Sequence, residues 1–365
     1  MTHELIRPQP APARSGRIIE LDALRGLAAV AVVLFHYTTR YQQLFGHSES
    51  LAASVPWGHY GVDLFFMLSG FVILMTLERT ADGVKFAWGR FSRLYPTYWA
   101  AAALTFVVIS ITGLPGQEVT LAQALVNGTM LQGLLKVPHV DGAYWSLQAE
   151  LIFYANMLLL YKLGAFRRPA ATVVIWLAVA CLVYVLREYT LTAWPLAESV
   201  LRKLATIGSL KFIPMFGIGI LLYDAHRAGE YSRLTWVGLI ACVATVGWWE
   251  GTSALAVDLS LALLLWMAIS GRMSVLAAGP LVWLGAISYS LYLTHQNIGY
   301  VMIRNLEAQG VGPMFAITLA GVVALGIAIC LHHWVERPTM RFCKRVDPAA
   351  VVRRFRREKL ATANS

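Results

Sequence analysis

Ten apolar stretches, each close to 20 residues long, follow one another along the chain. They occupy about residues 18–38, 59–77, 94–112, 145–163, 170–187, 206–223, 234–249, 254–270, 281–303 and 314–334. A helix needs about 20 predominantly apolar residues to cross the hydrocarbon core of a bilayer. Hydrophobic residues make up 58% of the 365 residues and charged residues only 14%, which excludes an ordinary soluble domain. The pattern predicts an all-α fold, a polytopic membrane bundle of about ten transmembrane helices.

Lysine and arginine are concentrated in alternate connections between these stretches. If the N-terminus lies inside, the inner segments hold 22 of the 30 basic residues and the outer segments hold 6. Basic residues accumulate on the cytoplasmic side of short loops. We therefore expect both termini in the cytoplasm. The net charge of +10 then reflects topology and contact with anionic membrane lipids, and it requires no nucleic-acid partner.

The domain organisation is simple. Residues 1–16 are rich in Pro, Ala and Arg and are typical of a disordered cytoplasmic tail, residues 17–345 form one transmembrane domain, and residues 346–365 form a basic tail. The four cysteines have no metal-ligand or disulfide spacing, so we expect no metal and no permanently bound cofactor. The longest outer connection, about 113–144, is either a lid or acceptor-binding loop, or a plain connector.

Arg25 and His36 are the most informative polar residues of the first apolar stretch. Eleven residues advance a helix by three turns and about 20°, so both side chains lie on one face, ~16.5 Å apart along the axis. Ionisable groups at membrane depth usually mark a functional site. A histidine is suited to general base catalysis. The alternatives are an Arg25 side chain that reaches lipid phosphate and a His36 that bonds a backbone group at the interface.

Four further charged residues stand near the ends of apolar stretches. Asp63 could orient His36 or balance its charge, or it could cap a helix. Glu150 could be a general base or position an acceptor hydroxyl, or it could simply favour a helix N-terminus. Arg90 and Arg93 share a face if their turn is helical and are suited to phosphate groups, although basic residues also anchor inner loops.

Six segments, in this order, resemble the signature segments of the membrane-bound acyltransferase-3 family. They are LDALRGLAAVAVVLFH, GVDLFFMLSGFVI, RFSRLYPTYW, YWSLQAELIFY, ISYSLYLTHQ and WVERP. The resemblance extends over residues 18–345. It implies a bacterial inner-membrane enzyme that moves acetyl or other short acyl groups from cytoplasmic acyl-coenzyme A (acyl-CoA) to hydroxyl groups.

The resemblance also implies roles for single residues. Arg25 and His36 match the essential pair of the first helix, and Arg90, Arg93 and Arg25 match the acyl-CoA side. Glu150 matches the first acidic residue of its motif, whereas Leu151 stands where many family members carry a second acid. With Asp63, these residues form the predicted site. Possible acceptor or supporting residues are Ser69, Tyr144, Trp145, Tyr289, Ser290 and His295.

The sequence therefore predicts an O-acyltransferase with His36 as general base. Its co-substrate is acetyl-CoA or another short acyl-CoA. The expected acceptor is a hydroxyl of a sugar, exported glycan, glycolipid or glycosylated small molecule. The alternative is a polytopic transporter or ion-coupled carrier that uses the same buried polar residues.

Overall fold

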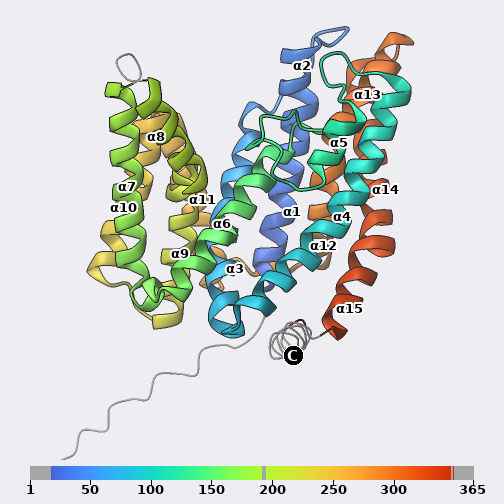
Figure 1. Ribbon diagram of the computed structural model, residues 1–365. Coiled ribbons are helices and arrows are strands. Elements are labelled where there is room, and N and C mark those ends of the chain that lie inside the picture. Colours follow the sequence, from blue (N-terminus) through green and yellow to red (C-terminus); the bar gives the residue numbers. More distant parts are fainter. Residues whose placement is uncertain (1–17, 191–194, 347, 349–365) are drawn as a thin grey trace, which may run out of the picture.

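The computed structural model describes residues 18–190, 195–346 and 348, which form helices joined by short connections (Figure 1). The α-helices are α1 (Ile19–Leu34), α2 (Tyr41–Leu44), α3 (Gly61–Thr80), α4 (Gly83–Thr112), α5 (Leu121–Asn127), α6 (Tyr144–Lys162), α7 (Pro169–Thr190), α8 (Pro195–Ile207), α9 (Ile213–Ala228), α10 (Arg233–Glu250), α11 (Thr252–Ile269), α12 (Gly279–Thr294), α13 (Gln296–Ala308), α14 (Pro313–Leu331) and α15 (Arg337–Arg345). Wider π-helical turns are η1 (Phe35–Arg40) and η6 (His332–Glu336). Short 3₁₀ turns are η2 (Pro56–Tyr60), η3 (Ala165–Arg167), η4 (Leu210–Phe212) and η5 (Ser274–Ala277).

The all-α prediction is confirmed for the described residues, which contain no strand. Five helical stretches are long and apolar enough to cross a membrane, namely Pro56–Thr80, Gly83–Thr112, Pro169–Glu188, Thr252–Ile269 and Pro313–Arg345. A sixth is added if Leu196–Ile207 and Leu210–Ala228, which meet at 54°, count as one span. The chain is a multi-pass helical membrane protein by these criteria. Ten spans and two cytoplasmic termini stay predictions.

Two of the ten predicted stretches are broken in the structure. The stretch 206–223 turns at Ser209, whose φ is +53°, before α9 begins. The stretch 281–303 is interrupted at His295, where α12 ends and α13 begins. The Tyr37 hydroxyl donates a hydrogen bond to the His295 carbonyl oxygen at 2.7 Å, so a partner from another helix accompanies the break. Apolar composition alone does not reveal such a partner.

The centre of the bundle is held together by direct contact between helix backbones. A Cβ added at Gly285 of α12 would lie 1.9 Å from the Asp22 carbonyl oxygen of α1, and one added at Gly219 of α9 would lie 1.9 Å from the Met67 carbonyl oxygen of α3. Small residues allow this approach between membrane helices. Gly70 of α3 makes a similar approach to α9, because a Cβ added there would lie 2.0 Å from the Phe216 carbonyl oxygen.

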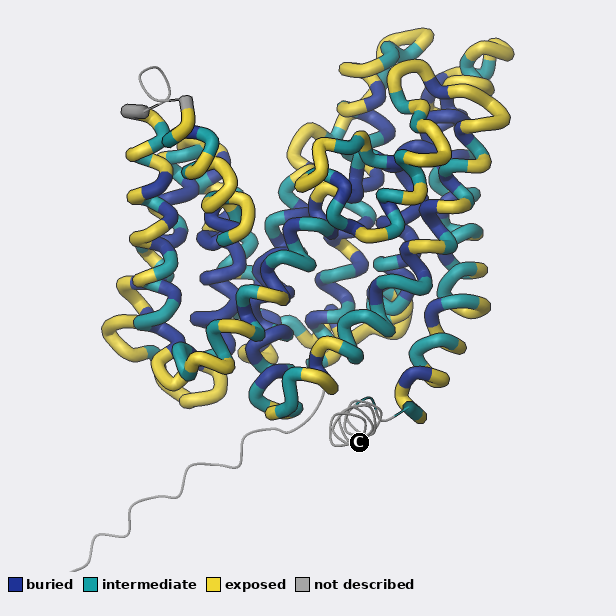
Figure 2. The backbone as a smooth tube through the Cα atoms, in the orientation of Figure 1, coloured by how far each residue is buried: buried dark blue, intermediate teal, exposed yellow. Residues whose placement is uncertain are grey.

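Buried residues are concentrated in the central helices, while exposed residues recur along the outer helices (Figure 2). Many of the exposed residues are large and apolar. Ile175 on α7, Ile240 on α10 and Val322 on α14 are each at least 60% exposed. Helices that are apolar on their outer faces are typical of a lipid environment. The polar site described next therefore lies inside a bundle whose surroundings are apolar.

Candidate functional site

His36 and His295 are hydrogen-bonded to each other where η1 meets the break between α12 and α13. The His36 Nδ1 atom lies 3.1 Å from His295 Nε2, and the ring centroids are 4.9 Å apart. His295 is fully buried, whereas His36 is partly exposed. The predicted base thus has a histidine partner from a segment 259 residues away in the chain.

Backbone carbonyl groups determine which nitrogen of each ring carries its proton. His295 Nδ1 lies 2.8 Å from the Tyr292 carbonyl oxygen, and His36 Nδ1 lies 2.9 Å from the Val32 carbonyl oxygen. Carbonyl oxygens only accept, so both Nδ1 atoms are assigned as donors. His295 Nε2 is then an acceptor for the His36 N–H. In a neutral His36 ring, the unprotonated nitrogen is Nε2, which has no hydrogen-bond partner among the described residues.

The local backbone contributes to this arrangement. His36 lies in η1, whose six residues form a wider π-helical turn, and such turns are frequent at functional sites. The Thr38 hydroxyl donates to the Leu34 carbonyl oxygen at 2.6 Å within the same turn. Sequence periodicity assumes a regular α-helix, so it did not reveal the change of pitch at Phe35.

Replacement of His295 tests whether this residue positions His36. We expect His295→Phe, which keeps a ring but removes the acceptor, to lower kcat about tenfold or more, because His36 loses one of the two acceptors that hold its proton on Nδ1 and orient its ring. His295→Gln offers an amide oxygen as acceptor and should restore part of the rate. Steady-state kinetics would show whether KM for the acyl donor stays unchanged. Equal rates in the Phe and Gln variants would contradict a positioning role.

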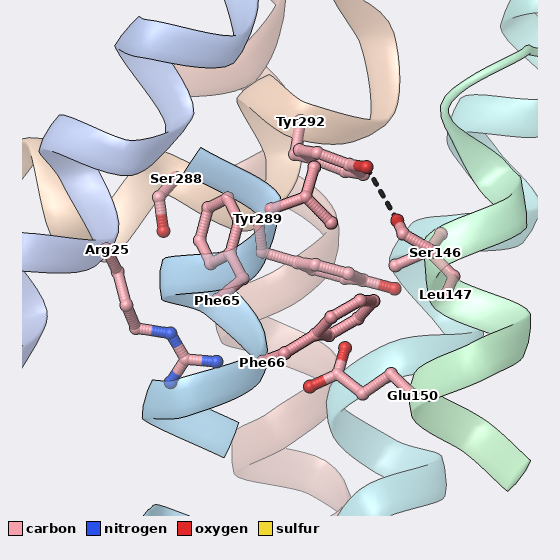
Figure 3. Close-up of a pocket in the computed structure, with 10 residues that line it drawn as sticks. Arg25, Phe65, Phe66, Ser146, Leu147, Glu150, Ser288, Tyr289 and Tyr292 are labelled. Atoms are coloured by element: carbon pink, nitrogen blue, oxygen red, sulfur yellow. Dashed lines mark hydrogen bonds between the residues drawn. The ribbon is translucent and has the colours of Figure 1, made fainter. Parts of the chain in front are cut away.

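Arg25 and Glu150 face the same small cavity, of about 40 Å³ (Figure 3). The cavity is lined by Arg25, Val62, Phe65, Phe66, Ser146, Leu147, Glu150, Ser288, Tyr289 and Tyr292. Arg25 shares this cavity with Ser288 and Tyr289 of α12, and His36 bonds His295 directly after α12. Both members of the predicted pair therefore lie on the side of α1 that faces α12.

Glu150 is held by two hydroxyl groups rather than by His36. Its Oε1 atom accepts a hydrogen bond from Ser69 Oγ at 2.6 Å and a second from the Tyr154 hydroxyl. Arg25 and Arg90 both have Glu150 among their charged neighbours. The roles expected for Glu150, a general base or a positioning group for the acceptor hydroxyl, stay predictions.

Tyr154 and Arg90 connect the cavity with the end of the bundle at which α4 begins. The Arg90 guanidinium lies 5.9 Å from the Tyr154 ring centroid, and its Nε atom is buried without a hydrogen-bond partner. Arg90 also lines two larger cavities. One is an apolar groove of about 510 Å³ between α4 and α6, and the other is a basic cavity of about 580 Å³ between α4 and α15.

The basic cavity brings together the two predicted donor-binding residues, Arg90 and Arg93, with residues that the sequence prediction omitted. The additional residues are Lys85, Trp88, Lys344 and Arg345. In the sequence analysis, Lys344 and Arg345 of α15 were counted only in the general excess of positive charge near the C-terminus. Tyr154 was missed too, although its position four residues after Glu150 places both on one helix face.

Asp63 lies in a different environment from the one predicted. Its charged neighbours are Asp258, Glu250 and Lys211, and no hydrogen bond or ion pair joins it to His36 in the described ranges. The support expected from Asp63 is provided by His295 instead. Asp63 is near the start of α3, where a small rotation of the helix decides which neighbour it meets. Its catalytic role stays a prediction.

The other predicted residues serve mainly to join elements. The Tyr144 hydroxyl donates to the Leu293 carbonyl oxygen at 3.0 Å, and Ser290 Oγ donates to Glu336 Oε2 at 3.0 Å. Tyr289 lines the cavity and donates to the Leu94 carbonyl oxygen. Trp145 is 43% exposed on the α3 and α9 side. In the described residues, no group of three or more His, Cys, Asp or Glu side chains could hold a metal ion.

The connection 113–143 is anchored next to the histidine pair. Asp141 is fully buried and accepts hydrogen bonds from the backbone N–H groups of Asn297 and Ala143, while Asn297 Nδ2 donates to the Val140 carbonyl oxygen. Burial raises the pKa of the Asp141 carboxyl to about 6, and the two N–H donors favour its charged form. The segment is therefore packed into the bundle. An acceptor-binding role stays a prediction.

Known proteins resemble this chain over nearly all its length. The acyltransferase domain model of the acyltransferase-3 family matches residues 18–333. The chain is 28% identical to acyltransferase MdmB of Streptomyces mycarofaciens, over 93% of this chain and 96% of that protein. It is 29% identical to exopolysaccharide production protein ExoZ of Rhizobium meliloti (strain 1021), over 82% of this chain and 94% of that protein. It is 27% identical to the putative membrane-bound transacylase BcsY of Komagataeibacter xylinus, over 93% of this chain and 90% of that protein. No solved structure matches the chain. The chain thus belongs to the acyltransferase-3 family of membrane acyltransferases.

Proposed function

We propose that this protein is an acyl-CoA-dependent O-acyltransferase of the bacterial inner membrane, with both termini in the cytoplasm. It would move an acetyl or other short acyl group to a hydroxyl of a sugar, exported glycan or glycolipid. The observation that carries the proposal is the free Nε2 atom of His36, whose other nitrogen is tied to Val32 and His295. A histidine held in one protonation state is suited to taking a proton from a hydroxyl group.

The proposed reaction is a direct transfer. His36 Nε2 takes the proton of the acceptor hydroxyl while the hydroxyl oxygen attacks the carbonyl carbon of the thioester. The new carbon–oxygen bond forms, the carbon–sulfur bond breaks, and coenzyme A leaves as a thiolate. This thiolate takes the proton from His36, which becomes neutral again. The products are the acyl ester and free coenzyme A, and Val32 and His295 keep His36 Nδ1 protonated throughout.

The donor would approach from the α4 and α15 end of the bundle. Arg90 and Arg93 line a basic cavity of about 580 Å³ there, and guanidinium groups are well suited to phosphates. Arg25, beside Glu150, would then lie along the path of the pantetheine arm towards His36. The cavity at Arg25 holds only about 40 Å³, close to the volume of one water molecule, so the arm requires side chains such as Phe65 and Phe66 to move.

The name of one relative supports the proposed class of acceptor. The name of ExoZ links that protein to exopolysaccharide production, which favours a sugar hydroxyl as the acceptor here. A glycosylated small molecule would present the same chemical group. The histidine pair lies next to the anchored connection 113–143. Helix α13, which begins after His295, and helix α15, which lines the basic cavity, lie towards opposite ends of the bundle (Figure 1). Donor and acceptor would therefore meet at His36 from opposite ends.

Purified protein in lipid nanodiscs tests this function. We expect release of free coenzyme A from acetyl-CoA that depends on added envelope glycan and equals the amount of acetyl ester formed. Free thiol and labelled ester measure the two products independently. Absence of transfer from every short acyl-CoA, combined with solute uptake by proteoliposomes without an acyl donor, would replace this proposal with a carrier function.

A further inference from the structure

Helix α15 forms one wall of the basic cavity, although it lies about 250 residues from α4 in the sequence. The cationic side chains that line the cavity are Lys85, Arg90 and Arg93 from α4, with Lys344 and Arg345 from α15. None of its described lining residues is acidic. Five positive charges around one cavity, with no neutralising carboxylate in its wall, are suited to a ligand with several negative charges.

A specific contact keeps α15 against α4. Trp88 Nε1 donates a hydrogen bond to the Cys343 carbonyl oxygen at 3.0 Å, directly before Lys344 and Arg345, the last two residues of α15. The Trp88 ring stacks on Phe91, with centroids 5.6 Å apart and planes at 19°. Trp88 therefore fixes the position of Lys344 and Arg345 and places an aromatic ring in the cavity wall.

The positive charges differ in how deeply they are placed. Arg93 is a charged neighbour of Arg25, and Arg90 is a charged neighbour of Glu150, so these two residues lie on the side of the basic cavity nearer to the small one. Lys85, Lys344 and Arg345 are exposed at the rim. In acyl-CoA, the diphosphate joins the pantetheine arm, while the ribose 3′-phosphate lies at the other end of the molecule. A donor that enters thioester first would leave its 3′-phosphate at the rim.

We propose that α15 completes the nucleotide site: Lys344 and Arg345 bind the 3′-phosphate of the acyl donor, and Trp88 borders its adenine. The inference rests on the proposed function and extends it to a part of the chain beyond the matched residues 18–333. Arg90 and Arg93 would bind the diphosphate of the same donor. A phosphate of an anionic lipid headgroup would offer the same chemistry to the rim, so the experiment separates the two sources.

Kinetics with two donors test the proposal in nanodiscs made of zwitterionic lipid. The donors are acetyl-CoA and acetyl-3′-dephospho-CoA, which differ only in the 3′-phosphate. For the wild type, we expect KM to be about tenfold lower for acetyl-CoA, as charge-assisted hydrogen bonds contribute this order of affinity. The double variant Lys344→Gln/Arg345→Gln should raise KM for acetyl-CoA to the dephospho value, leaving kcat and KM for the dephospho donor unchanged.

Arg341→Gln is the matched control. It removes one positive charge from the same helix, but Arg341 is exposed and does not line the cavity. We expect it to keep the preference for acetyl-CoA. Gel filtration and thermal unfolding would show that all variants are folded. If the double variant keeps the preference, or the wild type has none, the 3′-phosphate assignment is wrong.

Binding measurements distinguish a failed inference from a failed function. Adenosine 3′,5′-bisphosphate should bind the wild type about tenfold more tightly than adenosine 5′-monophosphate in calorimetry, and the double variant should bind both equally. This result does not depend on turnover. Equal binding by the wild type would overturn the proposal. A second result would also overturn it. If the double variant loses co-purified anionic lipid but binds both nucleotides as the wild type does, the rim binds lipid and not the donor.

Discussion

His36→Ala is expected to lower kcat by about 10²- to 10⁴-fold, the range that a positioned general base contributes. The substitution removes the free Nε2 atom that would take the proton from the acceptor hydroxyl. The affinity for acyl-CoA should stay unchanged, because the basic cavity lies at the other end of the site. Stopped assays of acetyl ester and calorimetric titration with coenzyme A would measure the two quantities separately.

The control for this variant is His333→Ala. His333 also lies in a π-helical turn, and its Nδ1 atom donates to the carbonyl oxygen of Ile329, four residues earlier, at 3.0 Å. It repeats the backbone contact of His36 but is exposed and outside the cavities described. We expect wild-type rates for it. A fully active His36→Ala protein would assign the base to another residue, and equal losses in both variants would indicate a structural effect.

Gly285→Ala should be the most damaging single methyl addition near the site. The new Cβ would lie 1.9 Å from the Asp22 carbonyl oxygen, so the backbones of α1 and α12 would have to separate. Added volume in a packed core costs about 1–3 kcal/mol, and a clash with backbone should reach the upper part of this range. The separation also moves His36 away from His295. We expect a lower midpoint of thermal unfolding together with loss of acetyl transfer.

Gly321→Ala provides a comparison in which the same methyl group meets open space. An added Cβ at Gly321 of α14 has no atom within 4 Å. Alanine is favoured over glycine inside a helix by about 1 kcal/mol, so this variant should be as stable as the wild type or slightly more stable. Equal unfolding midpoints for the two glycine variants would show that the α1 and α12 backbones are not in limiting contact.

The presence of helices was predictable because apolar stretches of about 20 residues leave little choice in a membrane. Each of the ten predicted stretches coincides with helix in the structure. Breaks within a stretch were not predictable. The interruption at His295 is accompanied by a bond from Tyr37, which lies 258 residues earlier in the chain, and no local pattern records such a contact.

In the site, too, features of a single helix were predictable and contacts between helices were not. Arg25 and His36 could be placed on one side of α1 because their spacing is a property of one helix. The partners of His36, Glu150 and Asp63 depend instead on the rotation of neighbouring helices. The sequence therefore named His295 as a supporting residue, but it could not show that His36 bonds His295, that Glu150 bonds Ser69, or that Asp63 lies near Asp258.

The close backbone contacts in the bundle have a consequence for motion. The backbones of α1 and α12 are in close contact at Gly285 and those of α3 and α9 at Gly219, so separation of either pair would lose this close packing. Helix α6 carries Glu150 on the opposite wall of the small cavity, and behind it lies the apolar groove of about 510 Å³. We therefore expect the acyl-CoA arm to enter when α6 moves towards this groove. The closely packed α1–α12 and α3–α9 pairs would keep the histidine pair in place during this motion.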